Sequence, residues 1–276
     1  MKVIDSHVHF WDYDPERHSW ISEEMKVIQK SFHPQDALVN FERSGVEGCV
    51  AVQADVTEYE TQYLADYAAA HPFIKGVVGW TDLKSPNLEE RLHTYRQNQV
   101  IKGFREIMQG SPDERFLTNK DFHQGVGLLK DFGFTYDVLI YHDQLPAAIK
   151  FTEKFPDQPF ILDHIAKPNI KSGEWKKWKE DIREIAKNPR MFCKVSGMVT
   201  ESDYANWTYQ DMLPYLDIVA EFFGTDRLCY GSDWPVCLLA AQYEQALGIV
   251  TEFLKQVPEV EKEKVLSGNT STFYNL

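Results

Sequence analysis

Short runs rich in apolar and β-branched residues recur along the chain, and stretches with helical periodicity separate them. The 276 residues contain eight such runs, at 3–10, 48–54, 74–81, 101–107, 135–141, 160–164, 191–196 and 227–232. Strand–helix–strand units at this spacing indicate a parallel sheet. Eight units within about 250 residues is the size of a closed (β/α)8 TIM barrel. We therefore predict an α/β fold with one barrel domain over residues 1–276, since no linker or shift in composition divides the sequence.

The formal net charge of −13 limits the classes of partner. Nucleic acids and anionic membranes attract clustered Lys and Arg, so neither is expected. No apolar run reaches the ~20 residues of a membrane helix, and no basic-then-apolar signal segment opens the sequence. The four cysteines form no CxxC pair, and three of them lie in strand-like runs, as buried free thiols do. We expect a cytoplasmic protein whose partner is a small molecule.

The first predicted strand carries two histidines, His7 and His9, two positions apart. Successive side chains in a strand alternate between its faces, so both imidazoles point the same way, toward the barrel mouth. Paired in this manner they can hold one divalent ion. The alternative is an incidental pair of buried polar residues, but such a pair still needs partners for its ring nitrogens.

Two further polar residues stand where predicted strands end. His164 ends the sixth strand, and we expect it at the mouth, with Asp163 on the opposite face in a structural role. Asp233 follows the eighth strand and precedes Pro235, beside the first strand once a barrel closes. Its carboxylate can bind a metal or take a proton from water, although an N-cap of the next helix is an equally common role for Asp. The neighbouring histidines favour the functional role.

Charged residues inside predicted barrel strands are costly to bury unless they are paired. Arg105 on the fourth strand is predicted to contact the substrate. Lys194 on the seventh is a second candidate, with an internal ion pair to Asp137 as the alternative. Three tryptophans in the predicted mouth loops either pack on a sugar ring or anchor those loops: Trp20, Trp207 and Trp234.

A set of motifs resembles the amidohydrolase superfamily. The motifs are IDSHVHFWD at 4–12, LDHIAKP at 162–168, KVSG at 194–197, FGTDR at 223–227 and YGSDWPVC at 230–237. An HxH pair alone is weakly specific, whereas all of these in this order are strongly specific. The resemblance runs along nearly the whole chain and is to the amidohydrolase-related group, which contains sugar lactonases and a pyrone-dicarboxylate lactonase. The stretches 200–207 and 214–216 look most like lactonases of the L-fuconolactone and L-rhamnonolactone type.

This resemblance implies a role for each central residue. Asp233 would be the general base. His7, His9 and His164 would belong to a metal site or polarise a carbonyl group. Arg105 would contact the substrate.

The resemblance also implies a metal, namely one divalent ion, zinc before others, on His7, His9 and Asp233. Some relatives act without a metal, so the ion is expected to be dispensable. A binuclear centre bridged by a carbamylated lysine is not expected, because Lys102 stands at the start of the fourth strand.

The resulting hypothesis is a hydrolase that opens the ester of a sugar-acid lactone with water activated by Asp233. A dianionic pyrone lactone is the first alternative, and it would require several arginines at the mouth, where the sequence places only Arg105. A non-oxidative decarboxylase on the same barrel would require a firmly bound metal and an acidic substrate. The alternative that is not an enzyme is a carbohydrate-binding protein with a degenerate site, and the intact set of histidines and aspartate argues against it.

Overall fold

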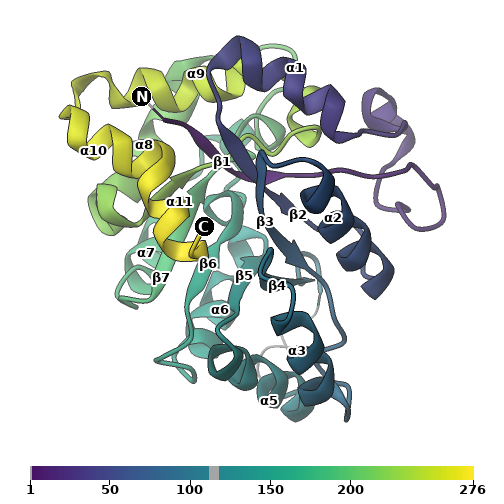
Figure 1. Cartoon of the computed structure of the whole chain (residues 1–276). Helices are drawn as coiled ribbons and strands as arrows, with labels where there is room; N and C mark the ends of the chain where they lie inside the picture. Colours follow the sequence, from purple (N-terminus) through teal and green to yellow (C-terminus); the bar gives the residue numbers. More distant parts are fainter. Residues whose placement is uncertain (1, 112–117) are drawn as a thin grey trace.

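The computed structural model of the protein describes residues 2–111 and 118–276. Within these ranges eight strands form one sheet in sequence order, and each pairs in parallel with the next (Figure 1). The strands are β1 (Ile4–Val8), β2 (Gly48–Val52), β3 (Ile74–Gly79), β4 (Ile101–Ile107), β5 (Thr135–Leu139), β6 (Phe160–Leu162), β7 (Met191–Val195) and β8 (Leu228–Tyr230). The predicted (β/α)8 TIM barrel is confirmed.

The barrel closes through the residues that follow its first and last strands. Val8 and Trp234 form a parallel bridge. The His9 N–H donates to the Trp234 carbonyl at 2.7 Å, and the Asp233 N–H donates to the His7 carbonyl at 3.0 Å. Closure of the barrel therefore fixes the spacing of three residues that were predicted to form the site.

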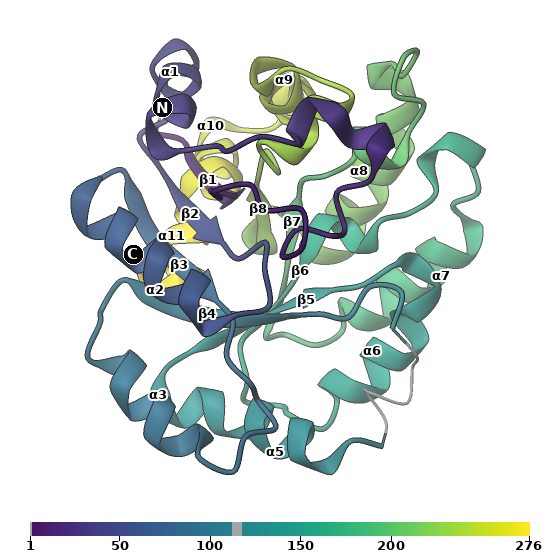
Figure 2. The same cartoon turned by 90° about the vertical axis from the view of Figure 1, so that its right-hand side faces the viewer.

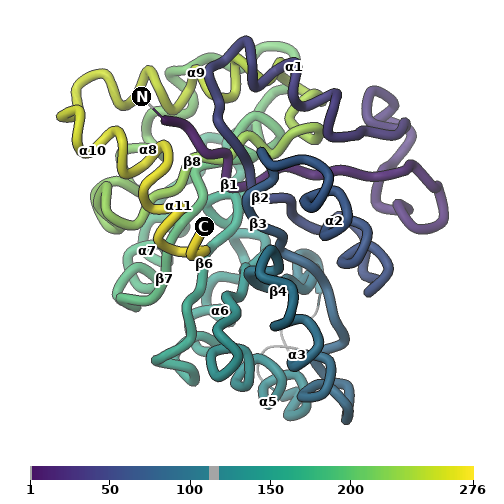
Figure 3. Tube along the Cα trace, in the orientation of Figure 1, coloured from purple at the N-terminus to yellow at the C-terminus, as the bar shows by residue number. Residues whose placement is uncertain are grey.

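Helices cover the outside of the barrel between successive strands (Figures 1 and 3). In the described ranges they are α1 (Pro34–Ser44), α2 (Glu58–Ala70), α3 (Leu88–Arg96), α5 (Lys120–Leu129), α6 (Leu145–Thr152), α7 (Lys176–Ile185), α8 (Tyr209–Phe223), α9 (Tyr243–Phe253), α10 (Glu259–Glu263) and α11 (Asn269–Tyr274). Local signals set their ends. Thr57 accepts the Glu60 N–H at the start of α2, and Gly45 ends α1 with φ 68°. None of the helices described here is long and apolar enough to cross a membrane.

A small apolar layer fills the inside of the barrel. It contains Val50, Val52, Val78, Ile161, Cys229, Phe273 and Tyr274. The two aromatic residues come from α11, whose C-terminus lies at the start of β4, where Lys102 Nζ donates to the Asn275 carbonyl at 2.7 Å. The C-terminal helix therefore closes the bottom of the barrel, which leaves the opposite end, at the carboxyl ends of the strands, for chemistry.

Several long connections lie at this open end, among them those after β1 and after β7. The first spans residues 9–33 and contains the short helix Glu23–Ile28, and the second spans residues 196–208. Figure 2 shows the first connection, in purple, passing in front of the strands. Long strand-to-helix loops at this end of a barrel commonly build the walls of an active site.

Candidate active site

His7 and His9 lie side by side at the carboxyl end of β1. Their Nε2 atoms are 3.1 Å apart, and both side chains are buried. His9 Nδ1 lies 2.7 Å from the carbonyl oxygen of Val52. A carbonyl oxygen can only accept, so Nδ1 carries the proton, and the Nε2 lone pair of neutral His9 points into the site.

Asp233 follows β8 with φ 59° and turns its carboxylate toward the histidines. Its Oδ1 lies 3.4 Å from His9 Nε2, 3.8 Å from His7 Nε2 and 3.9 Å from His164 Nε2. The N-cap alternative does not apply, because the next helical turn begins after Pro235. The structure thus brings together the four residues that were predicted to form the centre.

His164 reaches this cluster through a turn that strand alternation does not predict. β6 ends at Leu162, and residues 164–167 then all have positive φ, between 46° and 61°. Such angles are uncommon in residues other than Gly. The turn brings the imidazole to the mouth, where its Nδ1 lies 2.8 Å from Ser196 Oγ.

The prediction that Asp163 points away from the barrel interior was wrong. Its side chain is fully buried, with carboxylate oxygens 2.9 Å from Arg105 Nη1 and 2.9 Å from Lys194 Nζ. Asp163 continues the alternation of Ile161, which faces inward, whereas His164 enters the site through the turn. Its role is nevertheless structural, because it pairs with two buried cations.

Paired charges form a buried layer beneath the histidines. Besides its bond to Asp163, Lys194 Nζ lies 2.5 Å from Asp137 Oδ2, to which the Tyr274 hydroxyl donates at 2.7 Å. The same ammonium lies 3.0 Å from His7 Nδ1 and supports that ring from below. Lys194 has no exposed surface and does not line the cavity at the mouth. The ion-pair alternative therefore describes it, rather than a substrate contact.

Arg105 lies at the edge of the same layer. Its Nη2 donates to the Gln53 side-chain oxygen at 2.9 Å and to the Gln53 backbone carbonyl, while Nη1 pairs with Asp163 and lies 3.3 Å from His7 Nε2. These bonds hold the guanidinium in one place. It also lines the cavity, so contact with a substrate oxygen stays a prediction for Arg105.

His9, His164 and Asp233 line a cavity with about 460 Å³ of space free of protein atoms, counted out to open solvent. Its polar lining consists of His9, Arg105, Gln109, His164, Lys167 and Asp233. Its apolar lining consists of Trp20, Ala54, Ile107, Leu139 and Val236. A mixed lining of this kind suits a small molecule with both polar and apolar groups.

The three tryptophans that were candidate sugar contacts occupy different places. Trp20 lines the cavity, and its indole N–H donates to the Ala54 carbonyl at 3.0 Å. Trp234 is buried against two phenylalanine rings, and Trp207 donates to a backbone carbonyl of the loop after β8 at 2.8 Å. Neither of these two lines the cavity. Anchoring of the loops, the alternative role, describes Trp207 and Trp234.

Burial sets the protonation of the central residues. It lowers the pKa of His164 to about 3 and also lowers the pKa values of His7 and His9. Burial alone would raise the pKa of Asp233, but the neighbouring His164, His9 and His7 outweigh it and hold that pKa below its usual value. At neutral pH the site therefore contains neutral imidazoles around an ionised carboxylate. Both a proton acceptor and a set of metal ligands require this state.

The same donor atoms fit one divalent ion. One ligand atom from each of His7, His164 and Asp233 lies within 4.8 Å of the others. Donors around a tetrahedral zinc with bonds of about 2.0–2.1 Å are roughly 3.3 Å apart. The distances given above among these atoms and His9 Nε2 run from 3.1 to 3.9 Å. On β4, all of whose residues are described, Lys102 turns to the bottom of the barrel, so no lysine of that strand can bridge two metals.

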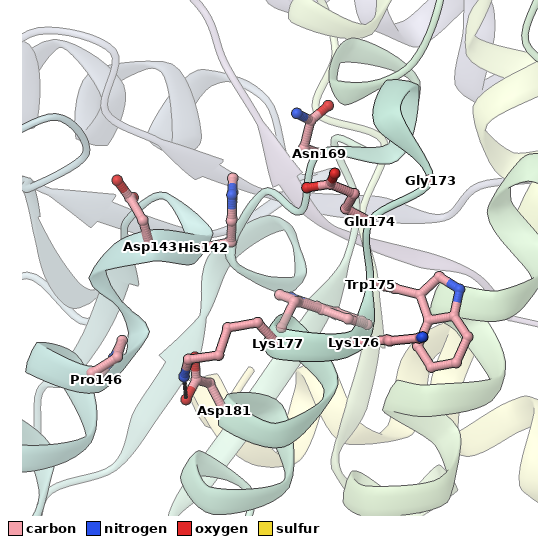
Figure 4. A pocket seen from close by; sticks show the side chains of 11 residues that line it. His142, Asp143, Pro146, Asn169, Gly173, Glu174, Trp175, Lys176, Lys177 and Asp181 are labelled. Atoms are coloured by element: carbon pink, nitrogen blue, oxygen red, sulfur yellow. Dashed lines mark hydrogen bonds and ion pairs between the residues drawn. The ribbon is translucent and has the colours of Figure 1, made fainter.

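A larger hollow lies on the outside of the barrel near α6 and α7 (Figure 4). It has about 1390 Å³ of space free of protein atoms, counted out to open solvent. Its Lys177 is already bonded to Asp181 at 2.5 Å, as the figure shows. The convergent imidazoles and carboxylate are all at the mouth instead, so we place the chemistry in the smaller cavity.

Sequence reasoning missed several residues of the cavity wall. Lys167 lines it, with its Nζ 3.5 Å from Glu201 Oε1. A signal was present, because Lys167 stands three positions after His164 in the same LDHIAKP motif. Ile107 and Leu139 were also missed, although Ile107 ends a predicted strand and Leu139 lies two residues before the end of another.

Comparison with known proteins fits this geometry. The family model described as "Amidohydrolase" matches residues 4–276. The chain belongs to the amidohydrolase family. This amidohydrolase is 34% identical to L-fucono-1,5-lactonase from Burkholderia multivorans, over 97% of this chain and 94% of that protein. It is 22% identical to L-rhamnono-gamma-lactonase from Scheffersomyces stipitis, over 87% of each. A crystal structure of an amidohydrolase from Burkholderia multivorans with bound zinc has 33% identity and a TM-score of 0.96, with both chains fully covered.

Proposed function

We propose that this amidohydrolase hydrolyses the ester of a sugar-acid lactone of the L-fuconolactone or L-rhamnonolactone type. The observation that carries the proposal is the convergence of the Asp233 carboxylate with the imidazoles of His7, His9 and His164 at a cavity with a mixed lining. Similarity to a lactonase along nearly the whole chain supports this reaction class. Opening a lactone requires a base for water and positive groups or hydrogen-bond donors for the oxyanion.

Asp233 is the proton acceptor in this mechanism. A water molecule within hydrogen-bond reach of the carboxylate loses a proton as its oxygen attacks the lactone carbonyl carbon. The tetrahedral oxyanion then collapses, and the bond between the carbonyl carbon and the ring oxygen breaks. The proton held by Asp233 goes to the leaving ring oxygen, so the product is the open hydroxy acid.

Arg105 and His164 orient the carbonyl and stabilise its developing charge. The guanidinium of Arg105 is already fixed by Gln53 and Asp163, so little reorganisation is needed when the charge appears. His164, 3.9 Å from Asp233, is also placed to pass the proton to the leaving oxygen.

A divalent ion would be held by His7, His9 and Asp233, with His164 as a further ligand in reach. When bound, it supplies Lewis-acid stabilisation of the oxyanion and lowers the pKa of water. We propose that the metal assists and is dispensable, since the carboxylate and the guanidinium provide a base and a positive group without it.

A dianionic pyrone lactone is less well supported. Among the described residues that line the cavity, Arg105 is the one arginine, and its guanidinium already pairs with Asp163. Two substrate carboxylates would each need a free cation or a bidentate arginine.

The direct test is to assay L-fucono- and L-rhamnono-lactones with and without a chelator, together with a dihydroxybenzoate as a decarboxylase substrate. We expect hydrolysis of at least one lactone, retained after chelation, and no release of CO₂. Release of CO₂ without lactone hydrolysis would overturn the proposal. If chelation abolished all lactonase activity and zinc restored it, the proposal that the metal is dispensable would be wrong, and the proposed lactonase function would stand.

A further inference from the structure

One side of the cavity wall is a continuous apolar surface. Ile107 and Leu139 are the last residues of β4 and β5, and they are partners in the register of these neighbouring strands. Partnered residues on adjacent strands point to the same face of a sheet. Because both line the cavity, their side chains form one surface, which we call the Ile107–Leu139 shelf.

The shelf begins where the charged layer ends. Two residues earlier on the same strands, Arg105 and Asp137 are also register partners. Alternate residues of a strand face the same way, so the barrel interior changes from charged to apolar in one step toward the mouth. A substrate group resting on the shelf therefore contacts carbon.

The Ile107–Leu139 shelf and the proton acceptor Asp233 lie on opposite sides of the barrel. In the strand order, β4 and β5 are the farthest from β8 and β1, whose ends carry Asp233 and His9. The same cavity contacts both sides. A molecule that fills it has polar atoms at the carboxylate and another part of its surface against the shelf.

We propose that the Ile107–Leu139 shelf selects lactones whose C6 is a methyl group over those with a hydroxymethyl group. The proposal rests on the proposed lactonase function and deepens it. A 6-deoxy-sugar lactone carries one apolar substituent, this methyl group, and the shelf offers it an apolar surface on the side of the barrel opposite Asp233. A hydroxyl in its place would lose hydrogen bonds to water and gain none from the shelf.

Two substrate pairs that differ only at C6 test the selection. They are L-fucono- with L-galactono-lactone, and L-rhamnono- with L-mannono-lactone. We expect kcat/KM to favour the methyl compound by about tenfold or more in each pair that is hydrolysed, since apolar pockets discriminate against an added hydroxyl by roughly 10–100-fold. A wild-type ratio near one would overturn the proposal.

Variants then locate the selection within the cavity. Ile107→Thr adds a hydroxyl to the shelf at a half-buried position and keeps the β-branched shape. We expect it to lower the methyl-to-hydroxymethyl ratio at least about threefold. Leu139→Asn makes a similar change on the neighbouring strand and should act in the same direction. Val236→Thr is the matched control, because Val236 lines the cavity outside the shelf.

The control should leave the ratio unchanged, whatever its effect on either rate. A ratio that responds to Val236→Thr and to neither shelf variant would place the selection elsewhere and overturn the proposal. Circular dichroism shows whether each variant is folded. Failure of the wild-type protein to hydrolyse any of the four lactones would instead overturn the proposed function, so the two failures are distinguishable.

Discussion

At the residue scale, backbone contacts determine what the central side chains can do. The carbonyl of Val52 fixes the proton of His9 on Nδ1. The Nε2 atom of His9 therefore presents a lone pair on the side of the ring that faces Asp233. Strand alternation was enough to predict that His7 and His9 share a face. It was not enough for His164, because the four successive residues with positive φ that bring it to the mouth leave no pattern in the sequence. Asp163 does follow the alternation, and it was assigned to the wrong face because His164 was expected to be the inward residue.

The lowered pKa of Asp233 predicts how activity depends on pH. A proton acceptor works above its pKa, so a lower pKa moves the loss of activity to lower pH. Since the histidines hold this pKa below the usual carboxyl range, we expect kcat/KM to stay within about twofold between pH 7 and pH 5. Initial rates of lactone hydrolysis in that range provide the check. A half-loss of kcat/KM above pH 6 while the protein remains folded would contradict this protonation state.

At the element scale, the turn after β6 and the end of β7 position His164 together. Gly197 follows the strand end with φ 61°, and a Cβ added there would stand 2.7 Å from His164 Nδ1. The seventh strand was predictable from its apolar run. The requirement for glycine at this position was not, because it depends on a close approach between two chain segments.

Gly197→Ala is expected to reduce kcat/KM at least about tenfold by displacing His164. It should also lower the free energy of unfolding by roughly 1–2 kcal/mol, because alanine is strained at positive φ. Gly45→Ala is the matched control, since φ there is 68° and the added Cβ would meet no atom within 4 Å. Urea unfolding and lactone hydrolysis measure the two effects. Equal activity in both variants would show that the close approach to His164 is unimportant.

Glu60 at the start of α2 predicts a pH-dependent contribution to stability. Its buried carboxylate accepts the backbone N–H groups of Ala54 and Asp55, and burial, the main cause, raises its pKa to about 8. The folded pKa is above the ordinary value of 4.5, so this contribution is complete below pH 4.5 and is lost as pH rises through 8. Glu60→Gln should remove the part of the decrease in stability with rising pH that Glu60 causes. Urea midpoints of both proteins at pH 5 and pH 8.5 test it, and parallel changes would refute it.

At the scale of the whole molecule, the barrel was predictable because each of its eight strands appears in the sequence as an apolar run followed by a stretch with helical periodicity. How the barrel is filled was less predictable. Lys194 and Asp137 were recognised as a potential ion pair, but the covering of the barrel bottom by α11 depends on the path of the C-terminal segment across β3 and β4. The same dependence on three-dimensional packing explains why the sequence left two roles open for Trp207 and Trp234, sugar contact and loop anchor, of which the structure favours the anchor.

Tyr274 provides a test of the C-terminal helix as part of the barrel core. Tyr274→Ala removes a fully buried ring and should lower the free energy of unfolding by about 3–5 kcal/mol. Tyr274→Phe removes only the hydrogen bond to Asp137 and should cost about 1–2 kcal/mol. Urea unfolding at pH 7 gives both values. A loss below about 1 kcal/mol for the alanine variant would mean that α11 is peripheral to the core.

The central claim is that Asp233 activates water for lactone hydrolysis. Asp233→Asn keeps the size of the side chain and removes its ability to accept a proton at neutral pH. The most direct measurement is kcat of this variant on the best lactone of the panel, beside its circular dichroism spectrum and unfolding midpoint. We predict a loss of roughly 10²–10⁴ in kcat with the fold unchanged. A folded Asp233→Asn protein with kcat near the wild-type value would contradict the mechanism.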